Sequence, residues 1–260
     1  MNTQLQEALV DNSIIPITNG VGYAQPSLEV LSCGGCNIRG GCLAEQLTID
    51  QDHSYQVIKN RKVLSKGDHV FRGGDDAKAI YVVSKGSIKS YMLTENGEEQ
   101  VLNFYMPGDV FGLEAMGSNN HISSTIALED TTICKIPLDG MQDRVLGQGF
   151  LNIISNNLLR NHNQMLILAR KDAEGRLASF LIDMSKRIEK YDYMSKNYSI
   201  DEVKVPMTRQ DIANYLGLAI ETVSRVLRRF QDGGILEVSR RKFKIYDYNY
   251  LVSIAGTQVA

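Results

Sequence analysis

The stretch that decides the fold is Met207–Leu227, MTRQDIANYLGLAIETVSRVL. Thr208 and Asp211 have the spacing of a capping box, which predicts that a helix begins there. Gly217 ends this helix, and after a short turn a second helix is expected from about Ile220 to Gln231. Two helices joined by a tight glycine turn cross at a steep angle, so the stretch predicts a helix-turn-helix.

The surroundings of this motif are basic. The segment Ile235–Tyr246 predicts a hairpin, or wing, whose tip carries Arg240, Arg241 and Lys242. Between Lys204 and Tyr246 nine basic residues stand against four acidic ones, an excess of five positive charges in a chain whose formal charge is −2. A basic module on an acidic body indicates a polyanionic partner for that module.

These features predict a module that binds double-stranded DNA. The second helix can enter the major groove, where Arg recognises guanine and Glu accepts from cytosine. The alternative is an ordinary surface helix with an i,i+4 ion pair between Glu221 and Arg225, but the wing and the local charge favour DNA. The expected contact residues are Glu221, Ser224 and Arg225 on the helix, and Thr208, Arg209, Arg228, Arg229 and Arg241 around it.

The cysteines suggest a metal site. Cys33, Cys36 and Cys42 follow a C-x2-C-x5-C spacing, and Cys134 is the only other cysteine of the chain. Four thiolates suit a [4Fe–4S] cluster or a tetrahedral zinc ion, and spacing alone leaves these two open. A redox Cys-x-x-Cys pair is disfavoured because no βαβ context surrounds it. Arg39 and Lys135 are candidates to offset the charge of a cluster.

The rest of the chain predicts an α+β protein of several parts. Short strands with Gly-Asp and Asn-Gly turns from about Arg61 to Pro137 predict a small barrel or roll. A helix of roughly 20 residues is expected between Gly147 and Asp172. The expected divisions are an arm over 1–32, a cysteine loop and sensor domain over 33–140, the long helix within 141–171, and a winged helix-turn-helix over 172–250.

The motif also carries a family resemblance. Met207–Leu218 with Glu221–Leu227 resembles the C-terminal motif of the CRP/FNR family, and the Glu221, Ser224, Arg225 arrangement resembles its FNR branch. The resemblance covers the chain from Cys33 to about Tyr246. It implies a cyclic-nucleotide-binding-like β-roll, a long dimerisation helix and a winged helix-turn-helix. It further implies a homodimeric activator that binds TTGAT…ATCAA-type palindromes and has RNA polymerase as a partner.

For the cysteines the resemblance implies an oxygen-labile [4Fe–4S] cluster held by Cys33, Cys36, Cys42 and Cys134. In the FNR branch the cluster promotes dimerisation and DNA binding under anaerobic conditions. A regulator of the same fold that is stabilised by zinc or based on haem is the alternative.

The long helix has two interpretations. The family seam carried onto this chain is polar and predicts a marginal dimer, through Asn152, Ser155, Leu159, His162 and Leu166. An apolar stripe of the same helix would pack within the chain against the roll; its members are Leu151, Ile154, Leu158, Met165 and Leu168.

Several functions are excluded by the sequence. No Arg lies between Arg72 and Arg144 to capture a cyclic phosphate, and Gly112-Leu113-Glu114 separates the Gly and Glu that the cAMP pattern places side by side, so no cyclic nucleotide is expected. No Ser/His/Asp or phosphate-loop constellation suggests an enzyme. No apolar run has the length of a membrane span and no secretory signal is found, which predicts a cytoplasmic protein without a membrane partner.

Overall fold

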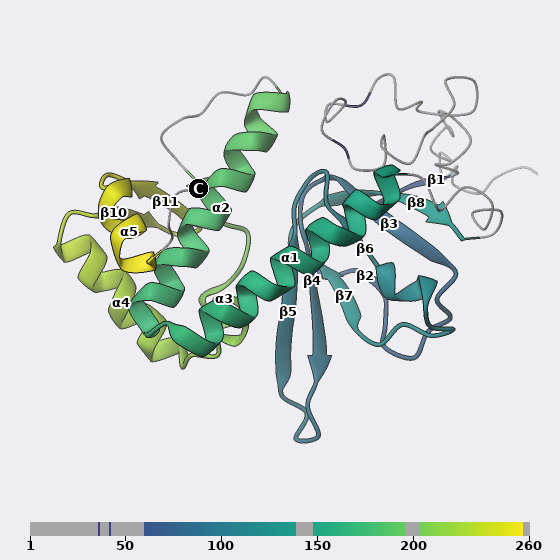
Figure 1. Ribbon diagram of the computed structural model, residues 1–260, viewed down its shortest axis with the longest axis horizontal. Helices are drawn as coiled ribbons and strands as arrows, with labels where there is room; N and C mark the ends of the chain where they lie inside the picture. Colours follow the sequence, from purple (N-terminus) through teal and green to yellow (C-terminus); the bar gives the residue numbers. More distant parts are fainter. Residues whose placement is uncertain (1–35, 37–41, 43–59, 139–147, 196–202, 257–260) are drawn as a thin grey trace, which may run out of the picture. The chain divides into compact units, whose positions relative to one another are not determined.

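The computed structural model describes Cys36, Cys42 and residues 60–138, 148–195 and 203–256. The first long range is rich in strands and the two that follow are mainly helical (Figure 1). The strands of the first range are β1 Asn60–Leu64, β2 His69–Phe71, β3 Ala79–Lys85, β4 Ile88–Leu93, β5 Glu99–Tyr105, β6 Val110–Phe111, β7 Ser124–Ala127 and β8 Thr131–Pro137. A short 3-10 helix over Leu113–Met116 lies between β6 and β7.

These strands form two antiparallel sheets, in the orders β1-β8-β3-β6 and β2-β7-β4-β5. A buried apolar layer joins them, with residues from both sheets, and this layer is the interior of the predicted roll. Its members are Leu64, Val83, Phe111 and Ile133 from the first sheet and Phe71, Ile88 and Ala127 from the second. The α+β architecture expected from the sequence is therefore confirmed.

Three turns of the roll share one construction, and each contains a Gly-Asp pair. In each turn the glycine has a positive φ between 91° and 94°, which favours glycine over other residues. The aspartate carboxylate accepts a hydrogen bond from the backbone N–H three residues before it, at 2.8–2.9 Å. The pairs are Gly67-Asp68, Gly74-Asp75 and Gly108-Asp109.

Strands β3 and β8 of the first sheet carry buried apolar residues on both faces. Successive residues of a strand point to opposite sides, so Ile133 of β8 points into the roll and Cys134 points outward. On the outer face Cys134 belongs to a second apolar cluster that contains Ile153 of the long helix α1, Gln148–Arg170. This outer face is where the cysteine site is found.

Helix α1 has the expected length but turns a different face to the roll. The residues it buries are Phe150 and Ile153, which are 5% and 0% exposed. The interpretation that the apolar stripe packs within the chain is wrong for Leu151, Ile154, Leu158 and Met165, whose side chains are 42–66% exposed, whereas its fifth member, Leu168, is half-buried. An amphipathic period shows that a helix has an apolar stripe, but not which partner covers it.

The C-terminal module is a winged helix-turn-helix. Its core joins helices and a three-stranded sheet of order β10-β11-β9 in one apolar cluster. Its elements are α2 Ala173–Ser195, β9 Val203–Lys204, α3 Arg209–Leu216, α4 Ile220–Asp232, β10 Leu236–Ser239, β11 Lys242–Ile245 and α5 Tyr248–Ala255. Leu177, Phe180, Leu181 and Met184 are buried on α2.

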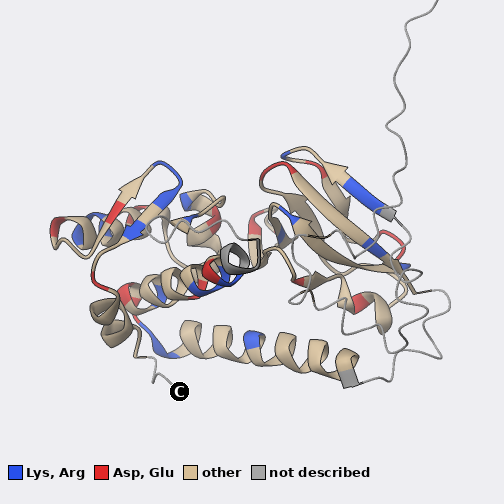
Figure 2. Ribbon diagram, turned by 90° about the horizontal axis from the view of Figure 1, so that it is seen from above, with Lys and Arg blue, Asp and Glu red and all other residues tan. Residues whose placement is uncertain are grey.

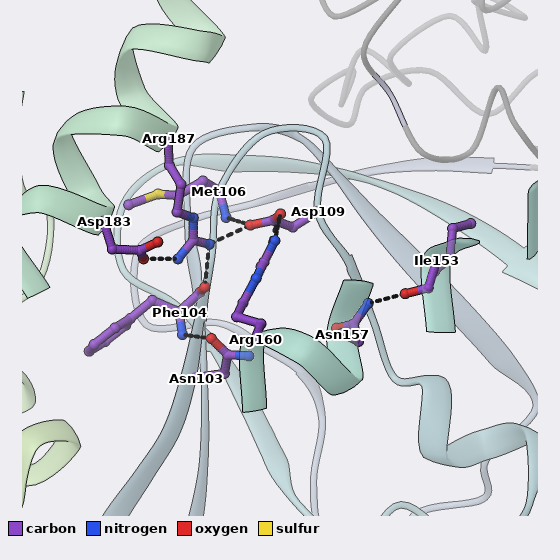
Figure 3. A network of polar contacts seen from close by, with 9 residues as sticks. All are labelled: Asn103, Phe104, Met106, Asp109, Ile153, Asn157, Arg160, Asp183 and Arg187. Atoms are coloured by element: carbon purple, nitrogen blue, oxygen red, sulfur yellow. Dashed lines mark hydrogen bonds and ion pairs between the residues drawn. The ribbon is translucent and has the colours of Figure 1, made fainter. Parts of the chain in front are cut away.

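A buried carboxylate connects the roll to both long helices. Asp109, in the third Gly-Asp turn, is paired with Arg160 of α1 at 3.2 Å and with Arg187 of α2 (Figure 3). Burial alone would raise the pKa of Asp109, but the two guanidinium groups outweigh it and hold that pKa below its usual value. Arg187 also donates to the backbone carbonyl of Phe104 at 2.6 Å.

Candidate functional site

The recognition helix α4 presents its polar face to solvent. Val223, Val226 and Phe230 are at most 4% exposed and anchor the helix to the module core. Glu221 and Arg225 lie on the opposite, exposed face, and Ser224 beside them is half-buried. The three expected base-contact residues are therefore brought onto one accessible side of the helix.

Arg225 does not form the ion pair that was the alternative to DNA binding. Its Nη2 donates to Thr222 Oγ1 at 3.2 Å, and among the described ion pairs none joins it to Glu221. Both charged side chains are exposed. The helix therefore presents an exposed guanidinium and an exposed carboxylate that are not paired with each other.

The other expected phosphate contacts differ in their surroundings. Arg228 lies 3.9 Å from Asp232 in an exposed i,i+4 pair, which is a weak interaction. Arg229 is ion-paired with Glu174 at the start of α2, so a phosphate would have to compete with that carboxylate. Arg209 is exposed at the first position of α3.

The wing carries charge at its tip, as expected. Arg240 and Arg241 form the turn between β10 and β11, and Arg240 has a positive φ of 51°. The backbone carbonyl of Arg241 accepts from Val205 N at 2.7 Å, which fixes the wing to the module. Figure 2 shows basic residues at this hairpin and almost none along α1.

The first helix of the motif has the predicted capping box. Thr208 Oγ1 accepts from Asp211 N at 3.0 Å, and Asp211 Oδ2 accepts from Thr208 N at 2.8 Å. Gly217 ends the helix with a positive φ of 59°, as expected for a C-cap. The Thr208 hydroxyl also donates to Asp211 at 2.6 Å. The role of Thr208 as a DNA contact stays a prediction.

Asp211 has a second function that the sequence did not reveal. Its Oδ1 accepts from Lys89 Nζ of β4 at 2.7 Å, and Lys89 is also paired with Glu99 of β5. Burial would raise the pKa of Asp211, but hydrogen bonds from Lys89 and Thr208 hold it below its usual value. No short-range pattern could have found this contact, because its partners are 122 residues apart.

The cysteine site lies on the outer face of the first roll sheet. Cys134 of β8 is 4% exposed, and Cys42 packs against the same apolar cluster. Cys36 Sγ lies 3.8 Å from Ser84 Oγ of β3. Ser84 is two residues beyond Val82, the cross-strand partner of Cys134, so the described cysteines gather over one part of the sheet.

One ligand candidate cannot be placed. Cys33 lies outside the described residues, as does Arg39. Within the described part of the chain no group of three or more His, Cys, Asp or Glu side chains is arranged to hold a metal ion. The buried thiol of Cys134 lies in an apolar cluster against which Cys42 also packs, and this donor chemistry suits a soft thiolate-ligated centre.

Strand register changes the expected cation of this site. Lys135 is exposed and follows Cys134 directly, so its side chain projects from the opposite face of the sheet. Arg61 of β1 is the direct cross-strand partner of Cys134 and therefore shares its face. Sequence reasoning missed Arg61 because the pairing of β1 with β8 joins residues more than 70 positions apart.

The proposed dimer residues all belong to the exposed side of α1. Leu159 and Leu166 are 60% and 58% exposed, and Asn152, Ser155 and His162 are also exposed.

Among the described residues no helix is long and apolar enough to cross a membrane.

Comparison with known proteins gives the family. Residues 61–146 match the cyclic nucleotide-binding domain family, and residues 175–254 match the Crp-like helix-turn-helix domain family. The chain is 35% identical over 232 residues to the fumarate and nitrate reduction regulatory protein of Escherichia coli strain K12, covering 87% of this chain and 91% of that protein. It is 36% identical over 252 residues to the anaerobic regulatory protein of Haemophilus influenzae, covering 92% and 96%.

Solved structures share the fold of this chain. FixK2 from Bradyrhizobium japonicum superposes with a TM-score of 0.67 at 28% identity, over 77% of this chain and 98% of that chain. The CRP/FNR regulator TTHA1359 from Thermus thermophilus superposes with a TM-score of 0.62 at 20% identity, over 76% and 99%. These relatives are transcription regulators and not enzymes, and the chain belongs to the CRP/FNR family of transcription regulators.

Proposed function

We propose that this protein is an oxygen-responsive transcription regulator in which a [4Fe–4S] cluster controls dimerisation and DNA binding. The observation that carries the proposal is the position of the described cysteines. Cys134 and Cys42 lie in the apolar cluster on the outer face of the roll sheet that also packs Ile153 of α1, the helix with an exposed apolar stripe. The names of the relatives, an anaerobic regulator among them, support the oxygen response.

The residues that would hold the cluster are Cys33, Cys36, Cys42 and Cys134. Cys134 supplies a thiol that is buried among aliphatic side chains, and Cys42 packs against the same side chains. Such surroundings exclude water from a cluster and leave thiolates as its only strong donors. When bound, the cluster supplies reactivity toward oxygen.

The chain's own contacts provide a route from this site to α1. Cysteine ligation would fix the loop around Cys36 and Cys42 against Val82, Cys134 and Ile153. Ile153 is fully buried and lies one turn from Asn157 and two turns from Arg160, which pairs with Asp109. A shift of the loop would therefore bias the orientation of a helix that the roll holds at two points.

The exposed residues of α1 support a wider dimer surface than the family seam alone. Leu159 and Leu166 lie beside four more exposed apolar residues on the same side of the helix: Leu151, Ile154, Leu158 and Met165. A contiguous apolar stripe of this kind marks an interaction surface. A second α1 would cover it, so the proposed dimer is stronger than the polar seam suggests.

In the dimer the two α4 helices would enter successive major grooves of a TTGAT…ATCAA-type palindrome, about one helical turn apart. Glu221, Ser224 and Arg225 would contact bases, and the wing, with Arg241 at its tip, would contact phosphates. RNA polymerase would be the partner at activated promoters.

A cyclic nucleotide is not part of the proposal. The carboxylate of Glu114, in the short 3-10 helix of the roll, already has a partner in the chain, because His121 Nδ1 lies 3.1 Å from Glu114 Oε1. His121 is 2% exposed and stacks on Phe71 with ring centroids 3.5 Å apart. Titration calorimetry with cAMP is expected to show no saturable heat.

Anaerobic purification followed by metal analysis and visible absorption tests the proposal. About four iron and four sulfide per chain, with a broad charge-transfer band that air removes, is the expected result. Stoichiometric zinc, a haem spectrum, or an air-stable centre would contradict it. DNA binding to the palindrome, measured on the same sample before and after air, completes the test.

A further inference from the structure

Arg61 has a side-chain nitrogen that is buried without an acceptor. Its Nε is shielded from solvent, and among the described residues no acceptor lies within hydrogen-bond reach of it. An N–H of a charged group that is buried without an acceptor is costly. Such a group calls for a partner beyond the acceptors that the described residues offer.

The position of Arg61 identifies that partner. Arg61, Cys134 and Val82 form one row across strands β1, β8 and β3. Directly opposed residues of antiparallel strands lie on the same face, with Cβ atoms about 4.5–5.5 Å apart. The guanidinium stem therefore runs beside the buried Cys134 thiol, on the face where Cys42 packs.

The neighbouring basic residues do not share this position. Lys62 and Lys135 are both exposed, and strand alternation places them on the opposite face of the sheet from Cys134. Of the basic residues described in β1 and β8, Arg61 alone shares the Cys134 face.

We propose that Arg61 is a positioning residue for the iron–sulfur cluster: its guanidinium donates to a cysteine or cluster sulfur and offsets the negative charge of the thiolate-ligated centre. This inference rests on the proposed function and adds to it a residue outside the cysteine motif. Hydrogen bonds to sulfur and local charge set both the stability and the reduction potential of such centres.

The test compares Arg61→Gln with Lys62→Gln. Both substitutions replace a positive charge by a neutral amide, but Lys62 lies one residue along the strand and on the other face. Arg61→Gln should weaken cluster loading at limiting iron by about 10–100-fold, the usual effect of losing an outer partner of a metal site. It should also make the reduction potential more negative, because a positive charge and a donor are removed. Arg61→Lys should restore part of the cluster loading and part of the reduction potential. Lys62→Gln should resemble the wild type in both measurements.

Thermal unfolding of the cluster-free protein separates this role from a structural one. A positioning role predicts that cluster-free Arg61→Gln is as stable as Lys62→Gln or more so, because a partly buried positive charge without a partner is removed. Equal loading and potential in the two variants would overturn the inference, as would a loss of cluster-free stability with an unchanged potential. A wild-type protein that binds no iron and sulfide would instead refute the proposed function itself.

Discussion

Lys89 of the roll and Asp211 of the helix-turn-helix are joined by a nearly buried ion pair. Their Nζ and Oδ1 atoms are 2.7 Å apart, and the two side chains are 11% and 10% exposed. The second oxygen of Asp211 accepts from the backbone N–H of Thr208 at 2.8 Å. One carboxylate thus starts α3 and fastens it to β4, so the strength of the domain contact and the start of the DNA-binding motif depend on the same residue.

Replacing Lys89 by Met should lower the free energy of unfolding by about 3–5 kcal/mol, because it leaves a buried carboxylate without its cation. Urea unfolding at fixed protein concentration measures the change. The double variant Lys89→Met/Asp211→Asn should recover part of the loss, since it removes the uncompensated charge as well. Additive losses in the two single variants would show that the pair is not coupled.

The same pair predicts an acid dependence of stability. The pKa of Asp211 is lowered in the folded protein, by hydrogen bonds from Lys89 and Thr208 that outweigh its burial. A carboxylate with a lowered pKa adds stability above its unfolded pKa, near 4, and that stability is lost as pH falls through the folded value. The difference in unfolding free energy between wild type and Asp211→Asn should therefore be constant from pH 7 to about pH 5 and shrink below pH 4. A difference that does not change with pH would contradict this.

Changing Cys33, Cys36, Cys42 or Cys134 singly to Ser should abolish stable cluster assembly, because the chain has no spare cysteine. Iron and sulfide content after anaerobic reconstitution is the measurement. Ser84→Ala is the matched control, since it removes a hydroxyl 3.8 Å from Cys36 Sγ and no thiol. A cysteine variant that retains a full complement of iron and sulfide would show that its cysteine is not a ligand.

The sequence predicted the elements whose signals are local. The capping box at Thr208 and Asp211, the C-cap at Gly217 and the Asn-Gly turn between β4 and β5 depend on neighbouring residues, and all three are found. Cys134 could be named as a ligand candidate because it is the only cysteine outside the loop, and the resemblance then assigns it to the cluster.

What the sequence could not predict depends on pairing between distant segments. Lys135 is beside Cys134 in the chain, yet the register of β8 with β1 places Arg61 beside it instead. The apolar stripe of α1 fits equally well against the roll or a second copy, and only the burial of Phe150 and Ile153 distinguishes them.

Arg225 and Arg241 should affect DNA binding in different ways. Arg225→Ala should weaken binding by about 1–3 kcal/mol at one guanine-containing position and relax specificity there. Arg241→Ala should weaken binding to all duplexes alike and reduce the salt dependence, as expected for a phosphate contact. Binding to the palindrome and to random duplex over a range of salt concentrations measures both. Equal losses of Arg225→Ala on both duplexes would show that it does not recognise a base.

The exposed apolar stripe of α1 is the proposed dimer surface. Leu158 lies in its middle and is 52% exposed, with Ile154 and Met165 one and two turns away on the same side. Two such helices related by a two-fold axis would bring the two Leu158 side chains close together, so Leu158→Asp would place like charges face to face in an apolar contact. Each 1.4 kcal/mol lost lowers dimerisation tenfold, and a buried unpaired charge exceeds that.

Sedimentation of anaerobic, cluster-loaded protein at low micromolar concentration should therefore show a dimer for the wild type and a monomer for Leu158→Asp. Asn156→Asp is the control, because it adds the same charge to an exposed position on the far side of the stripe. Leu159→Asp, at the edge of the stripe, should have a smaller effect than Leu158→Asp, whereas the reverse order would favour the polar seam through Asn152, Ser155 and His162. Air exposure of the wild type should also yield the monomer. A cluster-free protein that stays dimeric and still binds its palindrome would show that the cysteine site does not control the α1 contact, and the metal would then have a structural role only.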